Sequence, residues 1–257
     1  MKPGKIIGIA GGLGPFAHVD FERKLLDAAK RYADISSDQD YPEWIVSSVP
    51  ATPDRTEAIV GEGEDPGPWL LRSLKRLRQA GADFACVPCN TAHRFLPALD
   101  AEVGIPILDM IEFTVEAVDR LGASQRIGVL ATTGTLVAGV YHDALREAGH
   151  KPFSPLDLPE GEECQRAWVM DPVYGGPAGP GIKAEGPRVA YAELFETAIH
   201  HLAEQFHTNA VIAGCSEIPL ALTGDTVNGI PLIDPTRLLA ERAIQQAYGL
   251  DSSGSSG

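Results

Sequence analysis

Two cysteines, Cys89 and Cys215, each follow a short apolar run and precede small polar residues. Cys89 stands in the stretch FACVPCNTAHRF (84–95), and Cys215 stands in NAVIAGCSEIPL (209–220). A thiolate can remove a proton from carbon and a thiol can return one, so two facing thiols could invert a stereocentre. One cysteine would be the base and the other the acid, and the roles would exchange in the reverse direction.

Cys86 lies three positions before Cys89, and this Cys-x-x-Cys spacing also fits a redox pair or zinc ligands. Cys86 falls inside the apolar run, where a buried cysteine behaves as a small hydrophobic residue. We therefore expect Cys215, not Cys86, to be the partner of Cys89. His93 could polarise Cys89 or simply pack, and Cys164 lies in a polar segment without an evident role.

The segments that must position these thiols alternate between apolar runs and amphipathic stretches, a pattern typical of a parallel sheet covered on both faces. The predicted strands cover residues 5–11, 44–50, 84–88 and 105–110. The predicted helices cover residues 17–33 and 69–82, and a third begins at Thr91.

The same order of segments then occurs a second time. The matching pairs are IIGIAGGLGP (6–15) with RIGVLATTGT (126–135), DFACVPCNTAHR (83–94) with NAVIAGCSEIPL (209–220), and GIPILD (104–109) with GIPLID (229–234). Three matches in the same order indicate a duplicated α/β unit, with one cysteine after a strand in each half.

Topology then predicts where the two cysteines lie. Ligands of open parallel sheets bind outside the carboxyl ends of the strands, so the thiols should face one cleft. Each cysteine precedes an expected helix start, whose partial positive charge would favour the thiolate. Unpaired backbone N–H groups there could bind a carboxylate, and they belong to Asn90, Thr91, Ser216 and Glu217.

Composition narrows the partners. A net charge of −14 argues against nucleic-acid binding and requires local cations for an anionic substrate. No apolar run approaches a membrane span, and the N-terminal apolar stretch is too short for a secretory signal. Four cysteines in 257 residues do not suggest a disulfide framework, which favours a reducing, cytoplasmic setting. The tail DSSGSSG (251–257) is expected to be disordered.

Three motifs together resemble the aspartate racemase branch of the cofactor-independent aspartate/glutamate racemase superfamily. They are Gly-Gly-Leu-Gly-Pro-x-Ala (11–17), Cys-Asn-Thr-Ala-His (89–93) and Gly-Cys-Ser-Glu-Ile-Pro-Leu (214–220). The resemblance implies two pseudo-symmetric Rossmann-like (flavodoxin-like) α/β domains with the active site in the cleft between them. It also implies two catalytic cysteines, no PLP or other cofactor, no metal, and a homodimer. The expected domains are residues 1–109 with 224–250, and residues 110–223.

The resemblance extends to two cations. Pro53-Asp54-Arg55-Thr56 is similar to the family's PDRT segment, and Ile182-Lys183 is similar to its I-K-x-G segment. Arg55 and Lys183 would therefore bind a substrate carboxylate, and the opening motif adds Gly12 to the binding residues.

The sequence departs from the family's pattern at three places. His18 and Ser216 stand where threonine is usual. A Gly/Pro-rich spacer of unusual length separates Tyr174 from Lys183, which puts the position of Lys183 in question.

These features predict a racemase for an acidic amino acid, aspartate first and glutamate second. Arg55 and Lys183 would bind the side-chain carboxylate, and Glu217 would bind the ammonium group or tune Cys215. The alternatives are cis–trans isomerisation of an unsaturated diacid, hydantoin racemisation, decarboxylation, or carboxylate binding without catalysis.

Residues 172–187 could form a lid. The remaining histidines, at positions 142, 150, 200, 201 and 207, are expected to be solvated.

Overall fold

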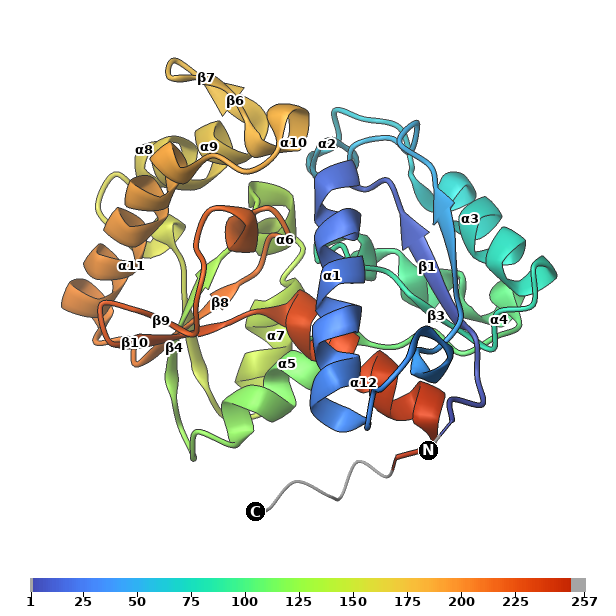
Figure 1. The fold of residues 1–257 in the computed structure, drawn as a ribbon. Coiled ribbons are helices and arrows are strands. Elements are labelled where there is room, and N and C mark those ends of the chain that lie inside the picture. The colour runs from blue at the N-terminus through green and yellow to red at the C-terminus, as the bar shows by residue number, and fades with distance from the viewer. Residues whose placement is uncertain (1, 251–257) are drawn as a thin grey trace.

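The computed structural model describes residues 2–250 and shows two α/β units side by side (Figure 1). The first sheet has the order β2-β1-β3 and is parallel throughout. Its strands are β1 (Ile7–Gly11), β2 (Trp44–Ser48) and β3 (Phe84–Cys86). The strand expected at residues 105–110 is reduced to a bridge between Ala85 and Ile107. Pro106 has no N–H group for a longer ladder, although its carbonyl accepts from the Ala85 N–H.

The second sheet has the order β5-β4-β8-β10-β9, with only β9 antiparallel. Its strands are β4 (Arg126–Leu130), β5 (Lys151–Phe153), β8 (Ala210–Ala213), β9 (Thr226–Val227) and β10 (Ile230–Ile233). Because β10 is hydrogen-bonded to β8, the expected return of the chain to the first domain at residue 224 is wrong. The returning segment is α12 (Pro235–Tyr248), which packs beside α1 (Pro15–Tyr32).

The register of the two sheets confirms the duplication. Ile7 pairs with Phe84 in the first sheet, and the matching residues Ile127 and Ala210 pair in the second. The bridge between Ala85 and Ile107 likewise matches the pair Val211 and Leu232. Both halves therefore place their cysteine at the same point beyond the same strand.

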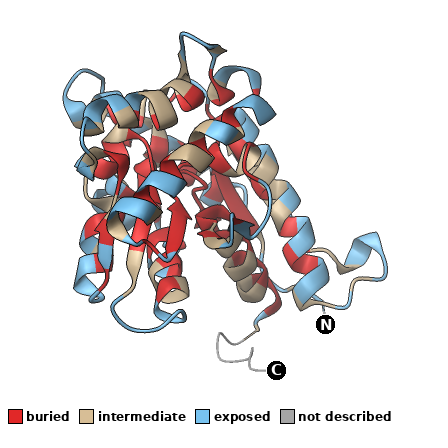
Figure 2. Ribbon diagram, turned by 90° about the vertical axis from the view of Figure 1, so that its left-hand side faces the viewer, coloured by how far each residue is buried: buried red, intermediate tan, exposed pale blue. Residues whose placement is uncertain are grey.

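Helices cover the buried strands on both sides, as Figure 2 shows by burial. Besides α1 and α12 they are α2 (Arg55–Val60), α3 (Gly67–Gln79), α4 (Asp100–Val103), α5 (Met110–Asp119), α6 (Thr133–Val137), α7 (Val140–Glu147), α8 (Gly161–Gln165), α9 (Asp171–Tyr174), α10 (Ile182–Glu185) and α11 (Ala192–Phe206). Within residues 2–250, no helix has both the length and the apolar character needed to cross a bilayer. The expected tail at 251–257 lies outside the described residues.

The segments after the two cysteines differ from the helices expected there. Thr91–Arg94 and Leu96–Ala98 are 3₁₀ turns followed by α4, and Ile218–Leu220 is a single 3₁₀ turn. Pro97 would remove a hydrogen bond from one continuous helix and clash with the preceding turn. A turn of three or four residues has only a small dipole, so it stabilises a thiolate less than a full helix would.

Candidate active site

Both cysteines line one narrow cavity between the two units, together with most of the residues expected to bind substrate. The cavity holds about 240 Å³ of space outside the atoms and has room for about one water molecule. Its lining residues are Leu13, Arg55, Cys89, Asn90, Thr91, Thr132, Tyr174, Lys183, Cys215, Ser216 and Glu217. Gly12 is not among them, because the chain turns there and presents Leu13 instead.

The two thiols are equally enclosed but have different neighbours. Cys89 and Cys215 are each 5% exposed. The Sγ atom of Cys215 donates to Oε2 of Glu217 at 3.1 Å. Burial and the charge of Glu217 raise the pKa of Cys215 well above its ordinary value, so this cysteine is a neutral thiol.

Arg55 is the cation beside Cys89. Its Nη2 donates to the carbonyl of Leu13 at 2.5 Å, and its Nη1 donates to the carbonyl of Pro53 at 3.1 Å. Burial alone would lower the pKa of Arg55, but Cys89 and Asp54 raise it overall, so the guanidinium stays charged. Asp54 also caps α2, accepting from the N–H groups of its first turn, and this places Arg55 at the helix start.

Three buried polar atoms of the lining have no hydrogen-bond partner within the described residues. They are Nε of Arg55, Nδ2 of Asn90 and Oε1 of Glu217. The Tyr141 hydroxyl donates to Oδ1 of Asn90 at 2.5 Å, which leaves the Asn90 amide N–H groups for a ligand. Buried polar groups are rarely left unpaired, so two donors and one acceptor here suit a ligand with an anionic and a cationic end.

A cluster of threonine hydroxyls joins the two units at the edge of the cavity and was missed from the sequence. Oγ1 of Thr91 lies 2.7 Å from that of Thr135, and Oγ1 of Thr132 lies 3.1 Å from that of Thr56. Thr132 occupies the position of Gly12 in the internal repeat, so the duplication was the signal that could have found it.

Lys183 reaches the cavity despite its long spacer. Its Nζ lies 3.3 Å from Oδ2 of Asp54 and 4.4 Å from the ring centroid of Tyr174. The spacer folds back on itself as the hairpin β6 (Gly175–Gly176) and β7 (Gly179–Pro180), so both of its ends meet the lining. Burial alone would lower the pKa of Lys183, but neighbouring groups, Glu217 foremost, raise it overall.

Cys86 and His93 lie outside the lining. Cys86 is fully buried in the first core cluster, and burial raises the pKa of its thiol, which confirms its expected role as a small hydrophobe. His93 Nε2 accepts from the Met110 N–H at 3.3 Å, so Nδ1 carries the proton and donates to the Cys89 carbonyl at 3.0 Å. Both ring nitrogens are thus committed to backbone, and His93 supports the cysteine's main chain rather than its thiol.

The expectation for the remaining histidines is confirmed in part. His200, His201 and His207 are exposed, but His142 and His150 are buried, which corrects the expectation of solvated side chains. His150 accepts from the Gln125 N–H and lies 2.8 Å from Asp119, so partners distant in sequence enclose it.

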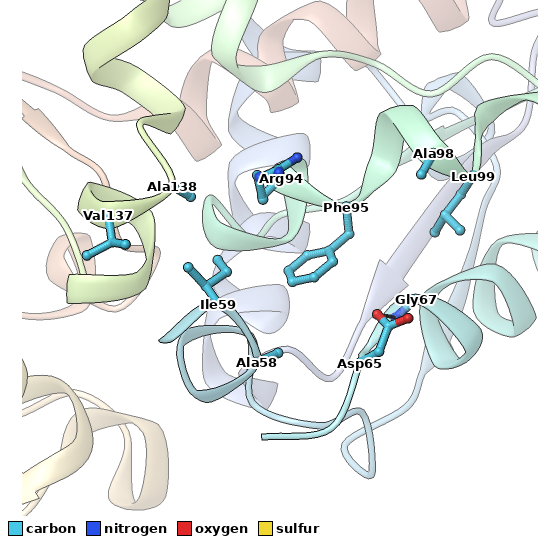
Figure 3. A pocket seen from close by; sticks show the side chains of 10 residues that line it. All are labelled: Ala58, Ile59, Asp65, Gly67, Arg94, Phe95, Ala98, Leu99, Val137 and Ala138. Carbon is cyan, nitrogen blue, oxygen red and sulfur yellow. Dashed lines mark hydrogen bonds between the residues drawn. The ribbon is translucent and has the colours of Figure 1, made fainter. Parts of the chain in front are cut away.

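A wider pocket is lined by residues of α2, of the turns after Cys89 and of the end of α6 (Figure 3). Apolar side chains line most of it, with Arg94 and Asp65 as its charged members. It contains no thiol and none of the expected substrate-binding residues. Within residues 2–250, no group of three or more His, Cys, Asp or Glu side chains is close enough to hold a metal ion.

A family model described as Asp/Glu/Hydantoin racemase matches residues 11–243. The chain belongs to this family. Within the racemase family, the broad specificity amino-acid racemase RacX of Bacillus subtilis is 23% identical over 93% of this chain and 96% of its own length. A glutamate racemase of Aquifex aeolicus is 28% identical over 64% of this chain and 59% of its own length.

Solved racemase structures share the fold. The aspartate racemase of Picrophilus torridus is 26% identical, covers 95% of this chain and 94% of its own, and gives a TM-score of 0.76. The glutamate racemase of Francisella tularensis, in complex with D-glutamate, is 16% identical. It covers 98% of this chain and 84% of its own, with a TM-score of 0.62. These likenesses confirm the expected family and the expected α/β architecture.

Proposed function

We propose that this member of the racemase family is a cofactor-independent racemase of an acidic amino acid, with Cys89 and Cys215 as its two proton-transferring residues. One observation carries the proposal: thiols from matched positions of the two units line the same narrow cavity. A single thiol would serve decarboxylation, and simple binding would need none. The duplication supplies two similar groups, as a reaction that runs in both directions requires.

The charges around the thiols support Cys89 as the residue that removes the proton first. Cys215 is the protonated thiol and acts as the acid, while Cys89, beside the cation Arg55, acts as the base. The Cys89 thiolate takes the Cα proton, and the electron pair of the broken C–H bond stays on the substrate. The Cys215 thiol then protonates the opposite face of Cα, which leaves a thiol at Cys89 and a thiolate at Cys215.

The unpartnered atoms of the lining support one orientation of the substrate. Nδ2 of Asn90, with the hydroxyls of Thr91 and Ser216, would bind the α-carboxylate, and Oε1 of Glu217 would accept from the ammonium group. Donors aimed at the carboxylate also stabilise the charge that develops when Cα is ionised.

Arg55 and Lys183 would bind a second carboxylate, which favours aspartate and then glutamate. Lys183 would exchange its ion pair with Asp54 for the substrate. Because the cavity admits about one water molecule, the hairpin between Tyr174 and Lys183 must open for substrate, as proposed for a lid over 172–187.

The test is a panel of L-amino acids incubated with the protein in deuterated water. Deuterium at Cα of aspartate, with growth of the D-isomer, is expected. The panel includes neutral amino acids, because one relative is named a broad specificity racemase. Exchange only with hydantoins, isomerisation of maleate, or binding of aspartate without Cα exchange would each overturn the proposal in favour of that alternative.

The proposal also includes a cytoplasmic setting, which would keep both thiols reduced, and a homodimer. Light scattering after size exclusion tests the dimer, and a mass of about 27 kDa would contradict it.

A further inference from the structure

His18 supports the loop between β1 and α1 through a single hydrogen bond. Its Nδ1 accepts from the backbone N–H of Gly12 at 3.1 Å. The ring also packs on Gly11, where an added Cβ would lie 2.8 Å from Cγ of His18. Gly12 has a φ of +88°, and a Cβ there would lie 2.6 Å from the backbone nitrogen of Val49. The loop is therefore held between the imidazole on one side and the chain after β2 on the other.

The same loop positions two groups of the cavity. The carbonyl of Leu13 accepts from Nη2 of Arg55 at 2.5 Å, and this hydrogen bond ties Arg55 to a segment outside its own loop. Gly14 lies against Glu217, since a Cβ at this position would come within 2.4 Å of Oε1. A shift of residues 11–14 would thus move a cation and an acceptor of the lining together.

We propose that His18 is a positioning residue that holds Arg55 beside Cys89 through the loop of residues 11–14. The inference rests on the proposed function as far as turnover is concerned. The bond requires the neutral ring with its proton on Nε2, because Nδ1 must accept. Burial lowers the pKa of His18 against the opposing charge of Glu22, which agrees with a neutral ring.

The matched variants are His18→Leu and His18→Asn. Both side chains are similar in size, but only Asn offers an oxygen near the place of Nδ1. Leaving the Gly12 N–H unpaired in His18→Leu should lower kcat/KM for aspartate about tenfold, mainly through KM, because Arg55 binds the substrate. His18→Asn should stay within about twofold of wild type. Leucine is the better helix former, so a loss confined to His18→Leu would not come from a weakened α1.

A second readout does not depend on turnover. Arg55 lies beside Cys89, so iodoacetamide should alkylate Cys89 several-fold more slowly in His18→Leu than in His18→Asn or wild type, as measured by peptide mass spectrometry. If the wild type shows no Cα exchange but this difference in alkylation holds, the proposed function fails and the positioning role survives. Equal kinetics and equal alkylation in the two variants, or equal impairment of both, would overturn the role of His18.

Discussion

The thiol of Cys215 donates a hydrogen bond of 3.1 Å to the carboxylate of Glu217, two residues further along the chain. Cys89 instead has the cation Arg55 as its neighbour. The two thiols stand at matched positions of the repeat, and their unlike neighbours are the basis for proposing Cys215 as the acid and Cys89 as the base. This difference comes from unlike residues around the two cysteines. Glu217 stands two positions after Cys215, where Thr91 follows Cys89, and Arg55 lies beside Cys89.

The first prediction concerns Glu217. Replacing Glu217 by Gln removes the negative charge that raises the pKa of Cys215, so the pKa of this thiol should fall. The measurement is the rate of alkylation of Cys215 against pH, whose midpoint should move to lower pH in the variant. Cys164 lies on α8 and does not line the cavity, so it is an internal control whose profile should not move. An unchanged midpoint for Cys215 would contradict the role given to Glu217.

The second prediction concerns substrate choice. Lys183→Met removes a cation that would bind the side-chain carboxylate, while it keeps a chain of similar length. A hydrogen bond to a charged group contributes about 1.5–3 kcal/mol, so the preference for aspartate over asparagine in kcat/KM should fall about 10- to 100-fold. Lys75→Met, which breaks an exposed ion pair with Glu102, is the control and should leave the preference unchanged. A preference unaffected by Lys183→Met would remove this lysine from the site.

The third prediction concerns the contact between the two units. A Cβ at Gly134 would lie 2.6 Å from Cα of Thr56, which is backbone and must shift. Gly134→Ala should destabilise the protein by about 1–3 kcal/mol and raise KM, because α2 also carries Arg55. Urea denaturation and initial rates measure both effects. Gly4→Ala, with no atom within 4 Å of the added Cβ, should change neither, and equal behaviour of the two variants would refute the close contact.

The fourth prediction concerns pH and stability. Burial lowers the pKa values of His18, His93 and His142 below the ordinary 6.5. Between each lowered pKa and 6.5 the unfolded chain therefore binds more protons than the native state. Stability should therefore fall as pH drops below about 6.5, by up to about 1.4 kcal/mol per pH unit for each histidine. The pKa values of Asp54 and Asp234 are also lowered, so these carboxylates lose their contribution to stability only below about pH 3.8. They do not affect stability near pH 6.5.

Urea denaturation at pH 7.5 and 5.5 measures this dependence. His142→Gln should reduce it, whereas replacing the exposed His207 by Gln should leave it as in the wild type. An equal pH dependence in His142→Gln and the wild type would contradict the explanation.

Local signals predicted much of this molecule. The apolar run that ends at glycine located β1. The repeated segments located β4 and placed both cysteines beyond matched strands. The likeness of residues 229–234 to 104–109 also implied that β10 belongs to the second sheet, but the boundary set at residue 224 did not follow it. Pro97 was a signal against a long helix after Cys89.

Other features depend on contacts that no local pattern encodes. Lys183 reaches the cavity only because the Gly/Pro-rich spacer closes as a hairpin. The partner of Asn90 is Tyr141, which comes from the other half of the chain. The burial of His150 likewise requires Asp119 and Gln125 to meet it after folding.

In the proposed mechanism one thiolate removes the proton of Cα and the other thiol supplies a new proton on the opposite face. The most direct measurement follows L-aspartate in deuterated water by NMR and chiral chromatography, with wild type, Cys89→Ala and Cys215→Ala in parallel, and with Cys86→Ala as the matched control. We expect D-aspartate with deuterium at Cα from the wild type and from Cys86→Ala. In each of the other two variants the rate of racemisation should fall by about 100- to 10,000-fold. Racemisation at the wild-type rate in either Cys89→Ala or Cys215→Ala would contradict the two-thiol mechanism.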